Sequence, residues 1–416
     1  MSDVRPFRGL RPRPDLVHKV AAPPYDVLNS EEARVMAGDN PLSYLHVSKA
    51  EIDFPPGTDS HSDEVYRKAA ENQESLVERG VLFYDELPSF YVYKLTMLGK
   101  SQTGFAIGAS VDEYENGLIK KHELTRRDKE DDRARHVDIL NANTGPVLLT
   151  YRATPKLDAI ITEVTGSFEP VYDFVAPDGI GHTLWAVSDP DLVATIVEAF
   201  REVPAMYVAD GHHRSAAAFR VRNLRRDKNR RHTGKELYNH FLAVTFPDNQ
   251  LRIMGYHRVV KDLNGRTPAK FLEEIARAFE VSPAASPEPP GLHQYTMFLD
   301  GKWYLLEARP GTWSQSDPVE SLDCSILQRN LLDPVLGVKD PRTDKRIDFV
   351  GGIRGTGELE RRCKTDMAVA FALAPVSVGQ LMAIADSGAI MPPKSTWFEP
   401  KLRDAIVVRG LDDTKE

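Results

Sequence analysis

The apolar residues of this chain fall into short runs typical of β-strands and into longer periodic stretches typical of helices. Gly and Pro residues separate these segments, and the order of the segments predicts an α+β fold with mixed strands instead of a series of βα units. The expected strands are residues 90–95, 104–109, 146–152, 183–187, 206–209, 241–246, 295–299 and 303–306. The expected helices begin at residue 31, at residue 65, at residue 191, after residue 211, at residue 268 and after residue 377.

Local signals mark several ends of these elements. Asn29 or Ser30 can cap the first helix, and Gly80 is the residue type expected just past a helix terminus. Asp300-Gly301, between two apolar runs, predicts a hairpin turn. The first half of the chain therefore contains the hairpin of residues 90–109, and the second half contains one of its own.

Composition narrows the class of protein. The chain has 416 residues with a net charge of -8, which opposes a general affinity for nucleic acid. It has no apolar run of the roughly 20 residues that a membrane span needs, and the N-terminus has no apolar signal core. Cys324 and Cys363 are too few for a disulfide framework. We therefore expect a cytoplasmic enzyme without a nucleic-acid or membrane partner, with a homodimer as one possible assembly.

Two charged blocks have more than one interpretation. Residues 116–143 are highly charged and form either a solvated helix face or part of a site. The basic run at residues 220–231 is interpreted as an exposed helix face, with binding of acidic partners as the alternative. Residues 1–60 are rich in proline, and consecutive prolines hold the backbone extended, so this segment is expected to lie across another element as a strap.

The densest chemistry lies between residues 206 and 218. The short apolar strand 206–209 leads into Asp210, Gly211, His212, His213 and Arg214, and a run of small residues typical of a helix follows. The first N–H groups of such a helix point into the turn and favour anions, and an arginine fork suits phosphate or carboxylate. Three interpretations stay open, namely a phosphate site, a metal site that uses the histidines and Asp210, and a purely structural turn. Phosphate is favoured because consecutive histidines diverge on a helix.

Other segments carry weaker signals. His122-Glu123 places a carboxylate beside cationic residues, where it stays ionised and is able either to act as a general base or to hold a cation. Tyr25-Asp26 lies either at the mouth of a site or merely in the strap. Lys394, Ser395 and Thr396 either contact phosphate oxygens or form a proline-braced structural loop. The chain has neither a Walker A motif nor a good dinucleotide fingerprint, so P-loop and Rossmann chemistry are not expected.

Five motifs occur in an order that resembles a known bacterial family, the one catalogued as domain of unknown function 1015. They are Pro23-Pro24-Tyr25-Asp26-Val27, His122-Glu123-x-Thr125, Ala209-Asp210-Gly211-His212-His213-Arg214, Tyr256-His257-Arg258-Val259-Val260 and Met391-Pro392-Pro393-Lys394-Ser395-Thr396. The turn also resembles the signature of free-serine kinases built on the ParB/sulfiredoxin-like fold. The resemblance implies a ParB/sulfiredoxin-like mixed-sheet core with an N-terminal strap and an added C-terminal α+β half.

The same resemblance implies a function and a set of site residues. It implies transfer of a phosphoryl group to the hydroxyl of free L-serine from pyrophosphate, ATP or ADP, with Mg²⁺ as cofactor. Glu123 would activate the hydroxyl, and Asp210 would assist it or hold the metal. The phosphate-binding residues would be Gly211, His212, His213, Arg214, Lys394, Ser395 and Thr396. The substrate-binding residues would be Tyr25, Asp26, His122 and Thr125.

The expected organisation has two parts. Residues 1–248 form the catalytic region, and residues 249–416 form a C-terminal α+β region. The loop 282–290 is internal to that second region, and the loop Met391–Phe398 is interpreted as returning to the site. Two alternatives from other functional classes stay open, a nucleotide-binding regulatory protein like those of the ParB type and a metal-binding protein without kinase activity.

Overall fold

A computed structural model describes residues 2–412 and divides the chain into two compact units. The first unit holds the chain up to Leu251 together with the segment that begins at Pro400, and the second holds Arg252–Glu399. The sequence placed the division at residue 248 and assigned everything after it to one region. The last segment instead lies in the first unit, because its strand β21 (Val408–Gly410) pairs there with β2 (Gly9–Pro12).

The centre of the first unit is a mixed sheet of nine strands. These are β1 (Val4–Arg5), β4 (Phe90–Met97), β5 (Lys100–Ser110), β6 (Ile119–Lys120), β8 (Val147–Tyr151), β9 (Tyr172–Val175), β10 (Gly181–Val187), β11 (Met206–Asp210) and β12 (His240–Pro247). Their order is β6-β11-β8-β12-β5-β4-β10-β9, with β1 beside β5. Only the pairs β11–β6 and β12–β8 are parallel. The predicted mixed sheet is confirmed, as are the hairpin of β4 and β5 and the fully buried strand β12.

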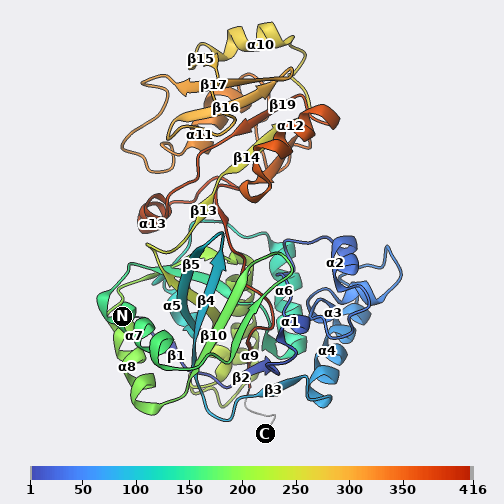
Figure 1. Cartoon of the computed structure of the whole chain (residues 1–416), viewed down its shortest axis with the longest axis vertical. Coiled ribbons are helices and arrows are strands. Elements are labelled where there is room, and N and C mark those ends of the chain that lie inside the picture. Colours follow the sequence, from blue (N-terminus) through green and yellow to red (C-terminus); the bar gives the residue numbers. More distant parts are fainter. Residues whose placement is uncertain (1, 413–416) are drawn as a thin grey trace. The chain divides into compact units, whose positions relative to one another are not determined.

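Helices cover this sheet because they carry apolar stripes toward it. Figure 1 shows α7 and α8 side by side along one flank of the sheet, where Leu157 and Phe200 enter its core. α6 packs on α9 through small and aliphatic residues such as Ala134 and Ala217. The helical segments of this unit are α1 (Val17–Val20), α2 (Ser30–Ala37), α3 (Leu45–Ser48), η1 (Ala50–Asp53), α4 (Asp63–Glu78), α5 (Val111–Glu115), α6 (Arg127–Leu140), α7 (Pro155–Ser167), α8 (Pro190–Arg201), α9 (His212–Lys228) and η2 (Leu237–Asn239).

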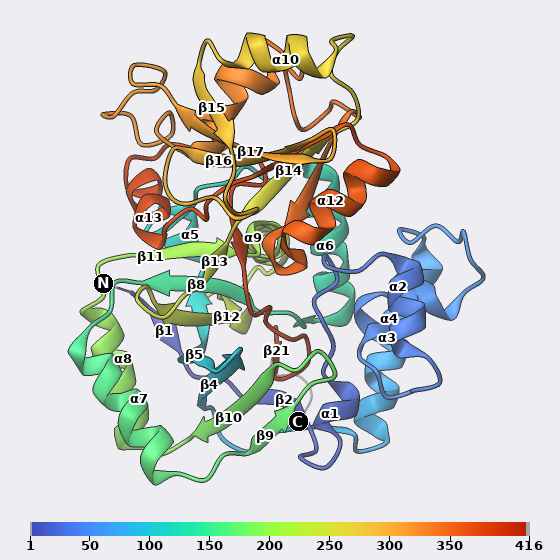
Figure 2. The same cartoon turned by 45° about the horizontal axis from the view of Figure 1, so that its top comes forward.

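The proline-rich N-terminal segment is not one extended strap, as the sequence predicted. It forms β1, which joins the central sheet, and β2 with several short helices (Figure 2). These helices and β2 build a second apolar core around residues such as Tyr44 and Val47. Pro12 ends β2 and Pro23-Pro24 follow α1, so the prolines interrupt the segment without holding all of it extended. A second sheet in the order β3-β2-β21-β7 joins this segment to the end of the chain, with β3 at Leu82–Tyr84 and β7 at Ala142–Asn143.

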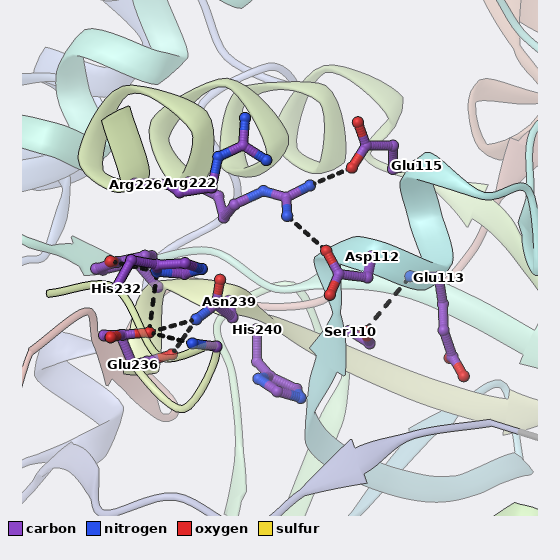
Figure 3. A network of polar contacts seen from close by, with 12 residues as sticks. Ser110, Asp112, Glu113, Glu115, Arg222, Arg226, His232, Glu236, Asn239 and His240 are labelled. Atoms are coloured by element: carbon purple, nitrogen blue, oxygen red, sulfur yellow. Dashed lines mark hydrogen bonds and ion pairs between the residues drawn. The ribbon is translucent and has the colours of Figure 1, made fainter. Parts of the chain in front are cut away.

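The basic run is an exposed face only in part, because Lys228, Arg230 and Arg231 are exposed but Arg222 and Arg225 are not. The Arg222 side chain is only 4% exposed and lies 2.5 Å from carboxylate oxygens of both Asp112 and Glu115 (Figure 3). Arg225 likewise pairs with Asp138 at 2.9 Å. These acids belong to α5 and α6, which are distant in sequence, so Arg222 and Arg225 form ion pairs that hold three helices together.

The second unit is built on a six-stranded sheet in the order β15-β17-β16-β19-β14-β18. Its predicted hairpin is confirmed, because Asp300 and Gly301 both adopt positive φ, 49° and 75°, between β16 and β17. The helix expected over residues 268–279 ends at Ile275, and Phe279 already begins a strand. The strands are β13 (Ile253–Met254), β14 (Tyr256–Val260), β15 (Phe279–Pro283), β16 (Gln294–Leu299), β17 (Lys302–Ala308), β18 (Ile347–Gly351), β19 (Val369–Ala372) and β20 (Trp397–Phe398). The helical segments are α10 (Pro268–Ile275), α11 (Asp323–Leu327), η3 (Gln328–Leu332), η4 (Gly352–Arg354), α12 (Gly355–Thr365) and α13 (Val378–Asp386).

A further sequence expectation is met in the second unit. α13 begins with the predicted capping box, in which Ser377 and Gln380 each bond the other's backbone. Within residues 2–412, no helix combines the length and the apolar character that crossing a bilayer would require.

Candidate functional site

The two central motifs meet because β6 and β11 are adjacent and parallel. Ile119 pairs with Met206 and Lys120 with Tyr207, so the next residues of both strands leave the sheet at the same edge. His122-Glu123 follows β6 directly, and the turn at Gly211 follows β11. The position of His122-Glu123 beside the turn is therefore set by a parallel pair of only two residues on each strand.

The turn itself opens a long helix without a side-chain cap. Gly211 has φ 91°, a conformation that favours glycine, and it forms the N-cap of the 17-residue helix α9. Its N–H donates to Oδ1 of Asp210 at 2.9 Å. Because Gly211 has no side chain, no N-cap group accepts from the N–H groups of the first helical turn. That turn presents partial positive charge to an anion.

Asp210 lies between two cations. The ammonium of Lys401 donates to its Oδ2 at 2.9 Å, and Arg214 lies on the same turn. Burial opposes ionisation of this carboxyl, but the charges of Lys401 and Arg214 outweigh burial and hold the pKa of Asp210 well below its usual range. Asp210 is therefore an anion at neutral pH, and its two positive neighbours leave the turn positive.

His122, Glu123 and His212 form one cluster at this edge. The two imidazole rings pack edge to face with their centroids 4.5 Å apart, and Oε2 of Glu123 lies 3.9 Å from Nδ1 of His212. His122 and His212 are buried, whereas the Glu123 side chain is 41% exposed. Burial lowers the pKa of His122 to about 4 and holds the pKa of His212 well below its usual value, so both rings are neutral at pH 7.

His213 and Thr125 have neighbours outside this cluster. Nε2 of His213 accepts the backbone N–H of Arg126 at 3.1 Å, and burial lowers the pKa of His213. The hydroxyl of Thr125 donates to Oε1 of Glu130 on α6. Neutral His213 therefore holds the loop before α6, and Thr125 contacts that helix through the same loop.

Tyr25 and Asp26 lie on the other side of Arg214. Nη2 of Arg214 is 3.9 Å from Oδ2 of Asp26, and the Arg133 guanidinium lies 4.0 Å from the centre of the Tyr25 ring. Burial raises the pKa of the Tyr25 phenol, with the Asp26 charge adding to it. Both residues are thus near the turn, and their substrate-binding role stays a prediction.

A small cavity lies behind Arg214. Its volume is about 30 Å³, room for about one water, and its walls include Tyr25, Arg133, Arg214 and Asp404. Burial raises the pKa of Asp404 to about 7, although Arg214 opposes the shift. Asp404 also forms a backbone bridge with Ala22, which ties the segment after Pro400 to the Tyr25-Asp26 motif.

Lys401, Asp404 and Arg133 were not predicted as site residues. Lys401 and Asp404 follow the Met391–Phe398 motif closely in sequence, but isolated charges give no local pattern. Lys401 is 191 residues from its partner Asp210, so only the return of the chain to the first unit brings them together.

The residues of the predicted phosphate loop belong to the second unit. There the Ser395 hydroxyl donates to the carbonyl of Pro392 at 2.6 Å, and Lys394, with φ 58°, lies 5.7 Å from the ring centre of Tyr256. These contacts explain a rigid turn within that unit. A phosphate role for Lys394, Ser395 and Thr396 stays a prediction.

Comparison with known proteins agrees with the motif pattern. Residues 4–325 match the model of the family described as "Protein of unknown function (DUF1015)", the family that the motifs predicted. No curated protein matches the sequence. Similar solved structures include a conserved hypothetical protein from Pyrococcus furiosus, at 14% identity over 73% of this chain and 95% of that chain with a TM-score of 0.35. They also include a free serine kinase in complex with AMP, at 14% identity over 72% and 91% with a TM-score of 0.34. A third is SbnI with C-terminal truncation from Staphylococcus aureus, at 11% identity over 75% and 90% with a TM-score of 0.39.

Proposed function

This chain belongs to the DUF1015 family, and we propose that it is a small-molecule kinase that phosphorylates the hydroxyl of free L-serine. The observation that carries the proposal is the juxtaposition of Glu123 with the turn of Asp210–Arg214, at one sheet edge and across 87 positions of sequence. Phosphoryl transfer requires alignment, a hydroxyl-orienting carboxylate and positive charge around the transferred group. This edge supplies all three.

The turn is the phosphate-binding part. The N–H groups at the start of α9 and the Arg214 guanidinium donate hydrogen bonds to phosphate oxygens, and they already have this geometry before the phosphoryl donor binds. Arg214 is held by Asp26 and by the carbonyl of Pro146, so its guanidinium is fixed in place. A fixed donor set stabilises the charge that develops on the transferred group without rearranging.

Glu123 is the base in this proposal. Its side chain is half-exposed and reaches solvent at the same edge, where a serine hydroxyl is able to approach it. As the hydroxyl oxygen bonds to the terminal phosphorus of the donor, its proton passes to Glu123. The bond from that phosphorus to the bridging oxygen breaks, and the leaving phosphate or nucleotide keeps the electron pair.

Lys401 and Asp210 complete the charge balance. Asp210 holds Lys401 at the mouth of the turn, within reach of a donor phosphate that binds to the first turn of α9. The Asp210 carboxylate also suits Mg²⁺, which prefers carboxylate and phosphate oxygens. Each of its two oxygens accepts one hydrogen bond and keeps another lone pair for an ion. Such an ion would neutralise donor charge when bound.

The choice of serine as acceptor comes from the motif resemblance, and the donor is pyrophosphate, ATP or ADP. The test is direct. The full-length protein is incubated with L-serine, Mg²⁺ and each donor in parallel, and O-phosphoserine is measured by mass spectrometry. L-threonine and D-serine serve as matched acceptors. Phosphoserine formed with one donor and with L-serine alone is the expected result.

Two outcomes would overturn parts of this proposal. A donor that binds tightly while no acceptor is phosphorylated would leave a nucleotide-binding regulatory protein as the better description. Product from another hydroxyl compound, but not from serine, would keep the phosphotransferase and replace its acceptor.

A further inference from the structure

The cluster of His122, Glu123 and His212 has the composition of a transition-metal site. Each residue offers one ligand atom, and these atoms all lie within 4.8 Å of one another. Ligand atoms around one tetrahedral Zn²⁺ stand roughly 3.3 to 3.5 Å apart when each metal bond is about 2.0 to 2.2 Å. The Nδ1–Oε2 distance of 3.9 Å between His212 and Glu123 is already close to that spacing, so small side-chain rotations would complete it.

The buried histidine nitrogens point to a missing partner. Neither ring nitrogen of His122 makes a hydrogen bond of normal geometry among the described residues. His122 is only 2% exposed, so water does not replace the missing bonds freely. The His212 nitrogen that lies 3.9 Å from Oε2 of Glu123 is Nδ1. Buried polar groups are normally satisfied, and an imidazole nitrogen left open in this way is a ready metal ligand.

Charge and access also suit a cation. Glu123 places negative charge 3.9 Å from His212. Asp210 adds negative charge there, although Lys121 opposes it and Lys401 and Arg214 already neutralise part of the Asp210 charge. The half-exposed Glu123 side chain gives an ion a path from solvent to the buried rings. His213 is not part of this set, because its Nε2 already accepts the N–H of Arg126. The two histidines able to bind one ion are thus His122, which lies after β6, and His212, which lies after β11. The consecutive residues His212 and His213 do not form such a pair.

We propose that His122, Glu123 and His212 bind one divalent transition-metal ion, such as Zn²⁺, per chain. Two imidazoles and one carboxylate with an open fourth position are typical ligands for Zn²⁺ or Co²⁺ and unlike the all-oxygen sets that Mg²⁺ prefers. The site does not depend on the proposed kinase activity. If that activity is present, a bound ion occupies the Glu123 carboxylate and inhibits phosphorylation by removing the base.

The experiment uses the full-length protein after treatment with a chelator. Zn²⁺ is titrated by calorimetry, and Co²⁺ is titrated while its visible absorption is recorded, since that spectrum reports coordination geometry. We expect one ion per chain and the intense bands of a four-coordinate Co²⁺ site. H122A and H212A should weaken Zn²⁺ binding by more than about 100-fold, because loss of a direct ligand costs at least as much as loss of its supporting partners.

Two variants separate loss of a ligand from loss of the fold. E123Q changes a half-exposed side chain without changing its size, and it should weaken Zn²⁺ binding while the thermal unfolding curve stays unchanged. H213A should bind Zn²⁺ like the wild type. No binding of either ion, a six-coordinate Co²⁺ spectrum, or equal loss of affinity in H213A and H212A would overturn the proposal. None of these readouts depends on phosphoserine formation, so failure of the metal site and failure of the kinase proposal are distinguishable.

Discussion

The two ends of α9 carry similar basic side chains that do different things. At the C-terminal end, Arg222 and Arg225 are paired at 2.5 to 2.9 Å with acids of α5 and α6. At the N-terminal end, the one carboxylate within 4.0 Å of Arg214 among the described residues is that of Asp26, at 3.9 Å. Arginines in close ion pairs hold helices together, whereas an arginine whose nearest carboxylate is more distant keeps charge for a ligand.

The same contrast separates the acids at the two ends. Asp112 and Glu115 are largely exposed, and each meets one buried arginine, so they serve the fold. Asp210 instead pairs with Lys401, which lies in the segment where the chain has returned to the first unit after forming the second. Substitutions at the N-terminal end should therefore change chemistry, and those at the C-terminal end should change stability.

The largest effect is expected from Asp210→Asn. The variant keeps the shape of the turn but releases Lys401 and removes a carboxylate from the reacting phosphate, so we expect turnover to fall by at least about 100-fold. Binding of the donor, measured by calorimetry, should weaken by no more than the roughly tenfold loss expected when Lys401 leaves the turn. D227N, at the exposed far end of the same helix, is the matched control and should keep full turnover. Wild-type turnover in D210N would remove Asp210 from the mechanism.

Lys401→Met should have a smaller effect, mainly on donor binding. Loss of one ammonium beside the phosphate should raise KM for the donor about tenfold, with a smaller change in kcat. Initial rates over a range of donor concentrations separate the two constants. K228M, at the other end of α9, should leave both unchanged, and a kcat loss in K401M without any change in KM would contradict this role.

Arg222→Met tests the structural end of the helix. The buried guanidinium would be lost, but its partners are mostly exposed, so the free energy of unfolding should fall by only about 1 to 2 kcal/mol. The kcat and KM of the folded variant should match the wild type. Urea denaturation and kinetics on one preparation check both statements, with R226M as the exposed counterpart. A specific loss of kcat in R222M would end the division between the two ends.

Asp404→Asn gives the smallest expected effect, visible only as a pH dependence. The folded pKa of about 7 lies above the usual value of an aspartate, so the folded state holds a proton that the unfolded chain has released. Protonated Asp404 makes its full contribution to the free energy of unfolding below the pKa that this residue has in the unfolded chain. That contribution is lost as the pH rises through the folded pKa of about 7. D404N should therefore become more stable relative to the wild type by about 1 kcal/mol between pH 6 and pH 7. A constant difference across that range would mean that Asp404 titrates normally.

Local patterns predicted much of this fold. The strand, turn and helix at Met206–Lys228 were predicted because an apolar run, a glycine and a helical run of small residues stand next to one another. The hairpin at Asp300-Gly301 and the capping box at Ser377 are equally local. The mixed sheet followed from the order of such segments, although the pairing of its strands did not.

What the sequence missed depends on contacts between distant segments. β6 has only two residues, too few to show a strand pattern, yet its pairing with β11 brings Glu123 to the turn. The acids that pair with Arg222 precede it by more than one hundred positions, so the sequence did not show that this part of the basic run is buried in ion pairs. Lys401 was missed for the same reason, because its segment crosses back from the second unit.

The central claim is that Glu123 and the Asp210 turn act as one site. A double-mutant cycle of E123Q and D210N, with phosphoserine formation measured under saturating donor and serine, tests it most directly. When residues act as a unit, the rate losses of the single variants do not multiply in the double variant. The double variant should therefore be at most about threefold slower than the slower of the two single variants. Rate losses that multiply in the double variant would mean that the two carboxylates act independently, and an unchanged rate in E123Q would remove Glu123 from the site.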